Sequence, residues 1–298
     1  MRWLFCSAGE RAAIFVQIAY DRVMTASPVR RFECYVALGD SSTEGLDDRD
    51  ERGGYRGWSR RLAQRIADTQ GSLAYANFGV RGLTTRQILD RQLAPALELG
   101  PDLATVFSGT NDVIARRFDA AAVERDMEAI QRPLIERGAT VLTFTLPDLT
   151  PVMPLARLIA HRIRALNDGL RAASHRTGAI VLDFAAHPVG ADPRIWSADR
   201  IHANSTGHQR IADALAHALE LPGTDDSWGD PLPELPAQTS WEWVAAELTW
   251  IRRHLLPWIT LSLRPGPALS ARGRRRPTLE RLVARDGPIA LDTGTICP

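Results

Sequence analysis

Residues 34–45 of this 298-residue chain read CYVALGDSSTEG, an apolar run that ends in a cluster of small and polar residues. A short continuous run of apolar, β-branched and aromatic residues is typical of a strand that is buried on both faces of a parallel sheet. Ser41 follows the run closely. Its hydroxyl is therefore expected at the carboxyl end of a strand, where open α/β sheets place their active sites.

Four further apolar runs follow, at 73–78, 103–107, 140–144 and 180–184, and helical patterns separate them. Strands that alternate with helices predict a parallel sheet covered on both faces by right-handed crossovers. We therefore expect an α/β fold, a three-layer α/β/α sandwich with a five-stranded parallel sheet. The expected helices cover residues 58–68, 85–96, 120–137, 155–175 and 205–219.

Polar clusters follow the other strands as well. Residues 77–82 read NFGVRG, residues 108–112 read SGTND, and DRIH begins at Asp199, past the fifth strand. A serine hydroxyl is a weak nucleophile until a base removes its proton. His202 is the candidate base, and Asp199 can orient its imidazole by accepting the Nδ1 hydrogen. These residues indicate a triad of Ser41, His202 and Asp199.

Together the four clusters resemble the sequence blocks of the SGNH hydrolases, also called GDSL esterases or lipases. The blocks are GDS near the N-terminus, a glycine after the second strand, GxND after the third, and DxxH near the end of the domain. All four occur in this order over residues 32–221, with Thr110 in place of the second glycine of a frequent GGND variant. The resemblance implies the flavodoxin-like strand order 2-1-3-4-5.

The resemblance also implies an oxyanion hole, the set of donors that stabilises the negative oxygen of the tetrahedral intermediate. Its expected donors are the backbone N–H groups of Ser41 and Gly82 and the side-chain amide of Asn111. Gly82 has no Cβ, so a substrate can approach its backbone closely. Gly79 is the alternative donor.

Each assignment has a structural alternative. Ser41, like its neighbours Asp40 and Ser42, could cap a helix. Asp199 and His202 could likewise cap the last expected helix.

The third polar cluster and the remaining histidines have structural alternatives too. Asn111 could be a turn residue, and Asp112 is expected to bond loop amides rather than to join the triad. His208 is expected in packing or at the surface, and the other histidines have no partner pattern.

The expected activity is hydrolysis of a carboxylic ester through an acyl-serine intermediate, with a small-molecule ester as substrate and with neither a metal nor an organic cofactor. Three alternatives remain: an acyltransferase of the same fold, a peripheral membrane lipase or lysophospholipase, and a binding module without activity. The complete set of triad and oxyanion residues argues against the last.

Composition excludes several other classes of protein. All 36 basic residues are arginine, so mechanisms that need a lysine amine, such as a Schiff base or a P-loop, are ruled out. The basic residues balance 35 acidic ones, which gives no reason to expect nucleic acid binding. Cys6, Cys34 and Cys297 form neither a disulfide framework nor a zinc motif, and we expect a cytoplasmic protein.

Three segments are expected along the chain. Residues 1–31 form an irregular leader, with Met24 as an alternative start, and residues 32–221 form the hydrolase domain. Residues 222–298 hold a Pro-rich linker, a Trp-rich helix and an Arg-rich tail over 264–285, which is expected to be solvated.

The Trp-rich helix has a regular apolar spacing. Such spacing predicts one helical face that packs on the catalytic body, and docking of residues 241–263 on a membrane surface is the alternative. The oligomeric state is not predicted. The residues of the expected face are Trp241, Val244, Leu248, Ile251 and Leu255.

Overall fold

The protein is described from a computed structural model, which covers residues 30–51, 53–234, 240–257 and 277–285. Five parallel strands lie in the order β5-β4-β3-β1-β2, which is the expected order read from the other edge. The predicted α/β fold is therefore confirmed. The strands are β1 (Cys34–Gly39), β2 (Ser72–Asn77), β3 (Leu103–Phe107), β4 (Thr140–Phe144) and β5 (Ile180–Leu182).

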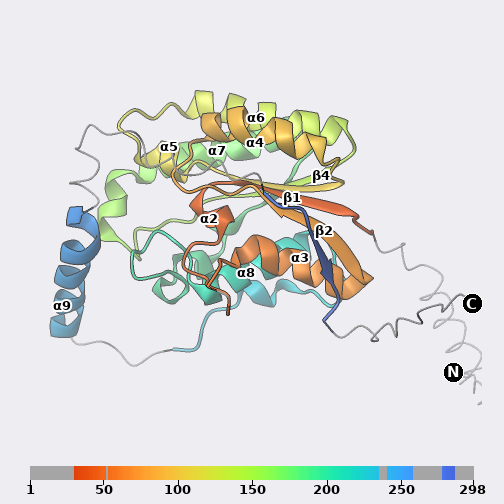
Figure 1. The fold of residues 1–298 in the computed structure, drawn as a ribbon. Helices are drawn as coiled ribbons and strands as arrows, with labels where there is room; N and C mark the ends of the chain where they lie inside the picture. The colour runs from red at the N-terminus through yellow and green to blue at the C-terminus, as the bar shows by residue number, and fades with distance from the viewer. Residues whose placement is uncertain (1–29, 52, 235–239, 258–276, 286–298) are drawn as a thin grey trace, which may run out of the picture. The chain divides into compact units, whose positions relative to one another are not determined.

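Helices cover both faces of the sheet, as Figure 1 shows. Helices α3 (Gly57–Gln70) and α8 (Ser205–Ala218) pack together on one face. On the opposite face lie α4 (Thr85–Glu98), α6 (Ala120–Glu136) and α7 (Ala160–Thr177). The helix expected at 155–175 is divided into a 3₁₀ turn, η1 (Pro154–Leu158), and α7.

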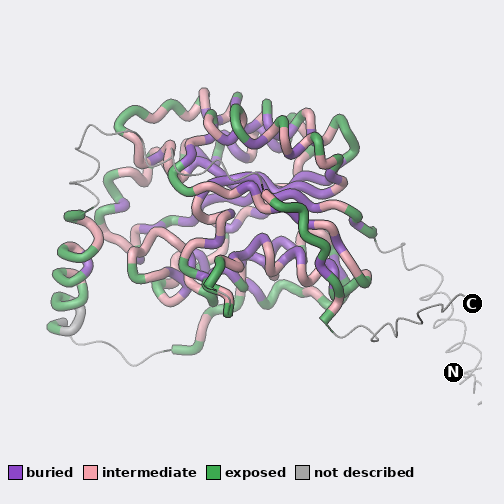
Figure 2. Tube along the Cα trace, viewed as in Figure 1, coloured by how far each residue is buried: buried purple, intermediate pink, exposed green. Residues whose placement is uncertain are grey.

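The strands between the two helical layers form the core, which Figure 2 shows as a buried band. Every residue of β3 and β4 is buried. Phe107 and Phe144 stack with ring centroids 4.0 Å apart, and Trp58 from α3 meets Phe144 edge-on at 5.3 Å. The rigid sheet holds the carboxyl ends of β1 and β3 next to each other, because these strands pair directly.

A sixth strand, β6 (Glu280–Val283), joins the sheet, and the sequence did not predict it. It runs antiparallel to β2, and it buries Leu282 while its other three side chains stay exposed. An edge strand with charged residues protects the sheet from pairing with other chains. The described part of the Arg-rich segment, 277–285, is thus partly built into the sheet rather than solvated throughout.

Helix α9 (Ser240–Trp250) continues into a π turn, η6 (Ile251–Leu255). Our prediction of its buried face was wrong: Trp241, Val244 and Leu248 are exposed, whereas Trp250 is buried. All three exposed residues lie in the α-helix before the π turn. Trp250 follows Leu248 by two residues, about 200° around the helix, so the side that α9 buries is nearly opposite the expected one.

The described residues include no helix that is long and apolar enough to cross a membrane. The expected leader lies outside them apart from residues 30–31, as do 258–263 of the Trp-rich segment and 264–276 of the Arg-rich tail.

Candidate active site

Ser41 lies at the carboxyl end of β1, as the first residue of the short helix α2 (Ser41–Glu44). Asp40 caps this helix, with its side chain accepting a hydrogen bond from the backbone N–H of Ser42 at 3.0 Å. Of the alternatives considered for this segment, the capping role therefore falls to Asp40. The turn is tight: a Cβ on Gly39 would lie 2.5 Å from the carbonyl oxygen of Phe107.

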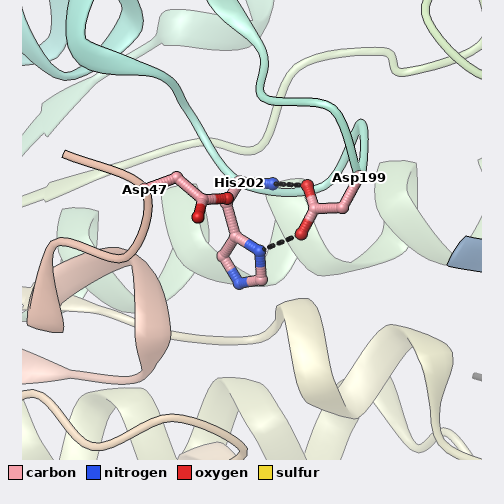
Figure 3. A group of neighbouring side chains, drawn as sticks. All are labelled: Asp47, Asp199 and His202. Carbon is pink, nitrogen blue, oxygen red and sulfur yellow. Dashed lines mark hydrogen bonds and ion pairs between the residues drawn. The ribbon is translucent and has the colours of Figure 1, made fainter. Parts of the chain in front are cut away.

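The structure brings Ser41, His202 and Asp199 together although Ser41 is more than 150 residues from the other two. Ser41 Oγ lies 2.8 Å from His202 Nε2, and His202 Nδ1 lies 2.6 Å from Asp199 Oδ2. Figure 3 shows the second of these contacts. The three side chains form a continuous chain of hydrogen bonds from a hydroxyl to a carboxylate, which is the geometry that a serine nucleophile requires.

Asp199 also organises the loop that carries His202. Its Oδ1 accepts hydrogen bonds from the backbone N–H groups of Ile201 and His202 at 2.9 and 3.0 Å. The cap of α8 is instead Asn204, whose side chain accepts from the N–H of Gly207 at 3.1 Å. The alternative in which Asp199 and His202 cap this helix is therefore wrong.

The electrostatics of the pair follow from this geometry. Burial by itself would lower the pKa of His202, but the hydrogen bond and negative charge of Asp199 outweigh burial and raise that pKa above its ordinary value. In the opposite sense, the pKa of Asp199 is held well below its ordinary value, because the contacts with His202 outweigh burial. The pair therefore favours a charged imidazole, the state that a base reaches after taking a proton.

Asn111 lies beside Ser41 in α5 (Thr110–Ile114), but its amide is engaged. Asn111 Nδ2 donates to the Leu83 carbonyl oxygen at 2.9 Å and to Asp40 Oδ2 at 3.1 Å. Burial raises the pKa of Asp40 to about 6. Asp112 accepts bonds from the backbone and side chain of Thr85, in agreement with its expected structural role.

The two glycines after β2 play different parts. A Cβ on Gly79 would lie 2.3 Å from the backbone nitrogen of Glu44, so Gly79 allows close packing. The N–H of Gly79 donates to Asn77 Oδ1 at 2.8 Å. Gly82 adopts φ +80°, which favours glycine, and a Cβ there would meet open space. Among the described residues none accepts the N–H of Ser41 or of Gly82.

The loop between α2 and α3 is held by residues whose function the sequence did not reveal. His208 is fully buried; its Nδ1 accepts from the N–H of Trp58 at 3.1 Å, and its Nε2 donates to the Leu46 carbonyl oxygen at 2.9 Å. The buried Asp48 pairs with Arg61 at 2.8 Å. Only their tertiary partners identify these roles, because neither residue lies in a recognisable motif.

Asp47 is a further neighbour of His202 that the sequence did not single out. Asp47, Asp199 and His202 offer ligand atoms within 4.8 Å of one another (Figure 3). Both ring nitrogens of His202 are already engaged, however, one by Asp199 and the other by Ser41. A metal ion bound here would therefore compete with the hydrogen bonds of the triad.

The hydroxyl of Ser41 opens into a cleft of about 1600 Å³. Two described parts of the C-terminal segment border this cleft. They are the π turn after α9 and the residues that lead into β6. Arg81 lies on the rim, but Glu44 binds its guanidinium at 2.7 Å. The apolar residues along the cleft include Ile114, Met153, Leu155, Leu158 and Leu255.

Comparison with known proteins agrees with this geometry. The model of the GDSL-like Lipase/Acylhydrolase family matches residues 37–210. "GDSL lipase Rv0518" of Mycobacterium tuberculosis is 25% identical over 199 residues, which cover 64% of this chain and 83% of that protein.

Solved structures show the same fold at lower identity. The lipase/acylhydrolase from Enterococcus faecalis has 23% identity and a TM-score of 0.52, over 65% of this chain and 99% of its own. The acetylxylan esterase Axe2 from Geobacillus stearothermophilus has 15% identity and a TM-score of 0.54, over 69% and 100%. The family match spans more than half of the chain and includes the serine, the histidine and the aspartate, so this protein belongs to the GDSL-like lipase/acylhydrolase family and is a hydrolase of that family.

Proposed function

We propose that the protein hydrolyses carboxylic esters through an acyl-serine intermediate on Ser41. The observation that carries this proposal is the unbroken contact from Ser41 Oγ to His202 Nε2 at 2.8 Å and from His202 Nδ1 to Asp199 at 2.6 Å. A histidine so placed can take the hydroxyl proton as the oxygen attacks the ester carbonyl carbon.

The reaction proceeds in two halves. Ser41 Oγ bonds to the carbonyl carbon while its proton moves to His202 Nε2, and collapse of the tetrahedral intermediate passes that proton to the departing alkoxide. Water then attacks the acyl-serine, gives a proton to His202 and releases the acid as the proton returns to Ser41. Asp199 stabilises the imidazolium in both halves without itself becoming protonated.

Three donors are proposed for the oxyanion. The backbone N–H groups of Ser41 and Gly82 support this role, since neither is used by a described residue. Gly79 is the weaker candidate, because its N–H already donates to Asn77. Asn111 has to release the carbonyl oxygen of Leu83 or the carboxylate of Asp40 before its amide can serve.

The apolar cleft favours an ester with an apolar acyl or alcohol part. Arg81 is a poor anion site, because its charge is already paired with Glu44. A chain-length series of 4-nitrophenyl esters, run beside Ser41→Ala, tests both activity and preference. Wild-type turnover that Ser41→Ala abolishes supports the proposal, and equal rates in the two proteins contradict it. An added alcohol that collects the acyl group would show acyl transfer instead of hydrolysis.

A peripheral lipase is the second candidate, and exposed apolar side chains on two segments favour it. Trp241 and Leu248 of α9 are 77% and 61% exposed, and Leu158, on the border of the cleft, is 70% exposed. Tryptophan and arginine suit a membrane interface, and Arg252 and Arg253 follow on the same helix.

Vesicle flotation of the full chain tests this candidate. Anionic vesicles should carry the wild type, and they should carry a variant with Trp241→Ser and Leu248→Ser less well. Point variants are preferable to truncation at residue 240, because truncation also removes β6 from the sheet. If both proteins float equally, or if neither floats, the result contradicts the peripheral-lipase candidate.

A further inference from the structure

The loop from Asp199 to His202 has an unusual backbone. Arg200, between the acid and the base, has φ +64°. This left-handed region is unfavourable for a residue with a long side chain, and it persists only where surrounding contacts hold it. The side chain of Arg200 is 18% exposed, so it is held against the protein rather than extended into water.

Helix α9 adds contacts that hold this loop to those that Asp199 Oδ1 makes within it. The indole N–H of Trp250 donates to the backbone carbonyl oxygen of Asp199 at 3.2 Å, and Trp250 is itself 6% exposed. The guanidinium of Arg200 lies over the indole ring, 4.8 Å from its centroid. Glu247, one helical turn before Trp250, forms an ion pair with Arg200 at 2.7 Å.

These contacts reinforce one another. A buried indole N–H needs an acceptor, and the Asp199 carbonyl oxygen is that acceptor. The cation–π contact and the ion pair are shielded from water, which strengthens both relative to exposed pairs. Because they fix Arg200, they also fix the backbone on each side of it, and with it the position of His202 relative to Ser41.

These contacts come from a part of the chain that the family model does not include. That match ends at residue 210, and α9 spans Ser240–Trp250. Bonds within the loop hold its backbone, among them the bond from the N–H of Arg200 to the Ser197 carbonyl oxygen at 3.0 Å, but none of these bonds holds the Arg200 side chain. A helix from outside the matched region holds that side chain and adds a bond to the Asp199 carbonyl oxygen.

We propose that Glu247 and Trp250 are positioning residues, and that α9 clamps the acid–base loop of the hydrolase through Arg200 and the Asp199 backbone. This inference rests on the proposed function, because it concerns the alignment of His202 with Ser41. Helix α9 of the C-terminal segment then contributes to catalysis by positioning the acid–base loop.

The test uses the full chain with Glu247→Gln, Trp250→Phe and a matched control, Thr249→Ala. Glu247→Gln removes the charge and keeps the shape, and Trp250→Phe keeps an aromatic ring but removes the N–H donor. Thr249 lies on the same helix and is exposed, and its hydroxyl donates to the Ala245 carbonyl oxygen of that helix and to no other described residue. Each protein is assayed for kcat and KM on a short 4-nitrophenyl ester and for the pKa of His202 by NMR.

Both test variants should lose about tenfold or more in kcat per folded molecule, with KM changed less than about twofold. The pKa of His202 should move down towards the ordinary value of about 6.5, because a looser loop admits water between His202 and Asp199. Thr249→Ala should change neither. In an Arg200→Gln background, Glu247→Gln should have no further effect, because Glu247 acts through Arg200.

Unchanged kcat and unchanged His202 pKa in both variants would overturn the clamp, as would additive losses from Arg200→Gln and Glu247→Gln. If Glu247 and Trp250 only stabilise the fold, the variants should melt at lower temperatures while the His202 pKa stays at its wild-type value. That result also overturns the proposed clamp. The NMR titration needs no turnover. A wild type that cleaves no ester therefore refutes the proposed function while the titration still decides the clamp.

Discussion

Asn111→Ala separates the chemical role of this residue from its structural role, and the structure sets the size of each. Loss of one oxyanion donor costs about 10²–10³ in kcat, or about 3–4 kcal/mol of transition-state stabilisation. The same change removes the hydrogen bonds to the Leu83 carbonyl oxygen and to Asp40. At about 1 kcal/mol each, these two bonds predict a loss of about 2 kcal/mol in the free energy of unfolding.

The control is Asn167→Ala. Asn167 is a buried asparagine that forms two hydrogen bonds with the backbone of Leu146. Its Oδ1 accepts from the Leu146 N–H at 2.9 Å, and its Nδ2 donates to the Leu146 carbonyl oxygen at 2.7 Å. It is absent from the residues that line the cleft. Its loss should destabilise the fold by a similar amount while kcat per folded molecule stays unchanged.

The assay combines urea unfolding with kcat on the same preparation, each rate being divided by the concentration of titrated active sites. Asn111→Ala should fall at least about 100-fold below Asn167→Ala in kcat, with little change in KM, because the donor is aimed at the oxyanion and not at the ground-state carbonyl. Equal kcat in the two variants would refute the reasoning and leave Asn111 as a residue that only holds its loop.

Three further predictions concern pH and metal ions. The acid limb of kcat/KM should lie above pH 6.5, because a raised pKa keeps His202 protonated to higher pH; a profile flat from about pH 8 to about pH 4 would exclude a histidine base. Chelators should leave activity unchanged. Added Zn²⁺ should inhibit the wild type by binding Asp47, Asp199 and His202, and it should inhibit Asp47→Asn more weakly. Activation by Zn²⁺ would contradict this prediction. Against the effect of burial, Arg61 and Arg56 lower the pKa of Asp48 to about 2. Asp48 should therefore contribute about 2 kcal/mol of stability above about pH 4 that is lost towards about pH 2, and the urea midpoint of Asp48→Asn should lack this fall.

The five parallel strands were predictable because each is a short apolar run that ends in turn residues, and such runs mark strands buried on both faces. Ser41 and the DRIH cluster were then placed by the rule that active sites lie at the carboxyl ends of such strands. Strand β6 escaped prediction because it has only four residues, ERLV, and two of them are charged. Its pairing with β2 joins segments that lie about two hundred residues apart.

Contacts between distant segments set the remaining features. The bond from Asn111 to Asp40 joins residues 71 positions apart. The amide of Asn111 therefore has partners that no local pattern reveals. The buried side of α9 is the one on which Trp250 and Glu247 find their partners, the Asp199 carbonyl oxygen and Arg200. Periodicity predicted the helix but indicated the wrong buried face, because it carries no information on these distant partners.

The most direct test of the account is the site of covalent labelling. A small fluorophosphonate reacts with a serine only where a base removes the hydroxyl proton, and the 2.8 Å contact with His202 is made by Ser41. Peptide mass spectrometry of the labelled full chain should place one adduct, on Ser41, and His202→Ala should abolish it. An adduct on Ser42, or no adduct in a folded sample, would contradict the assignment of Ser41 as the nucleophile.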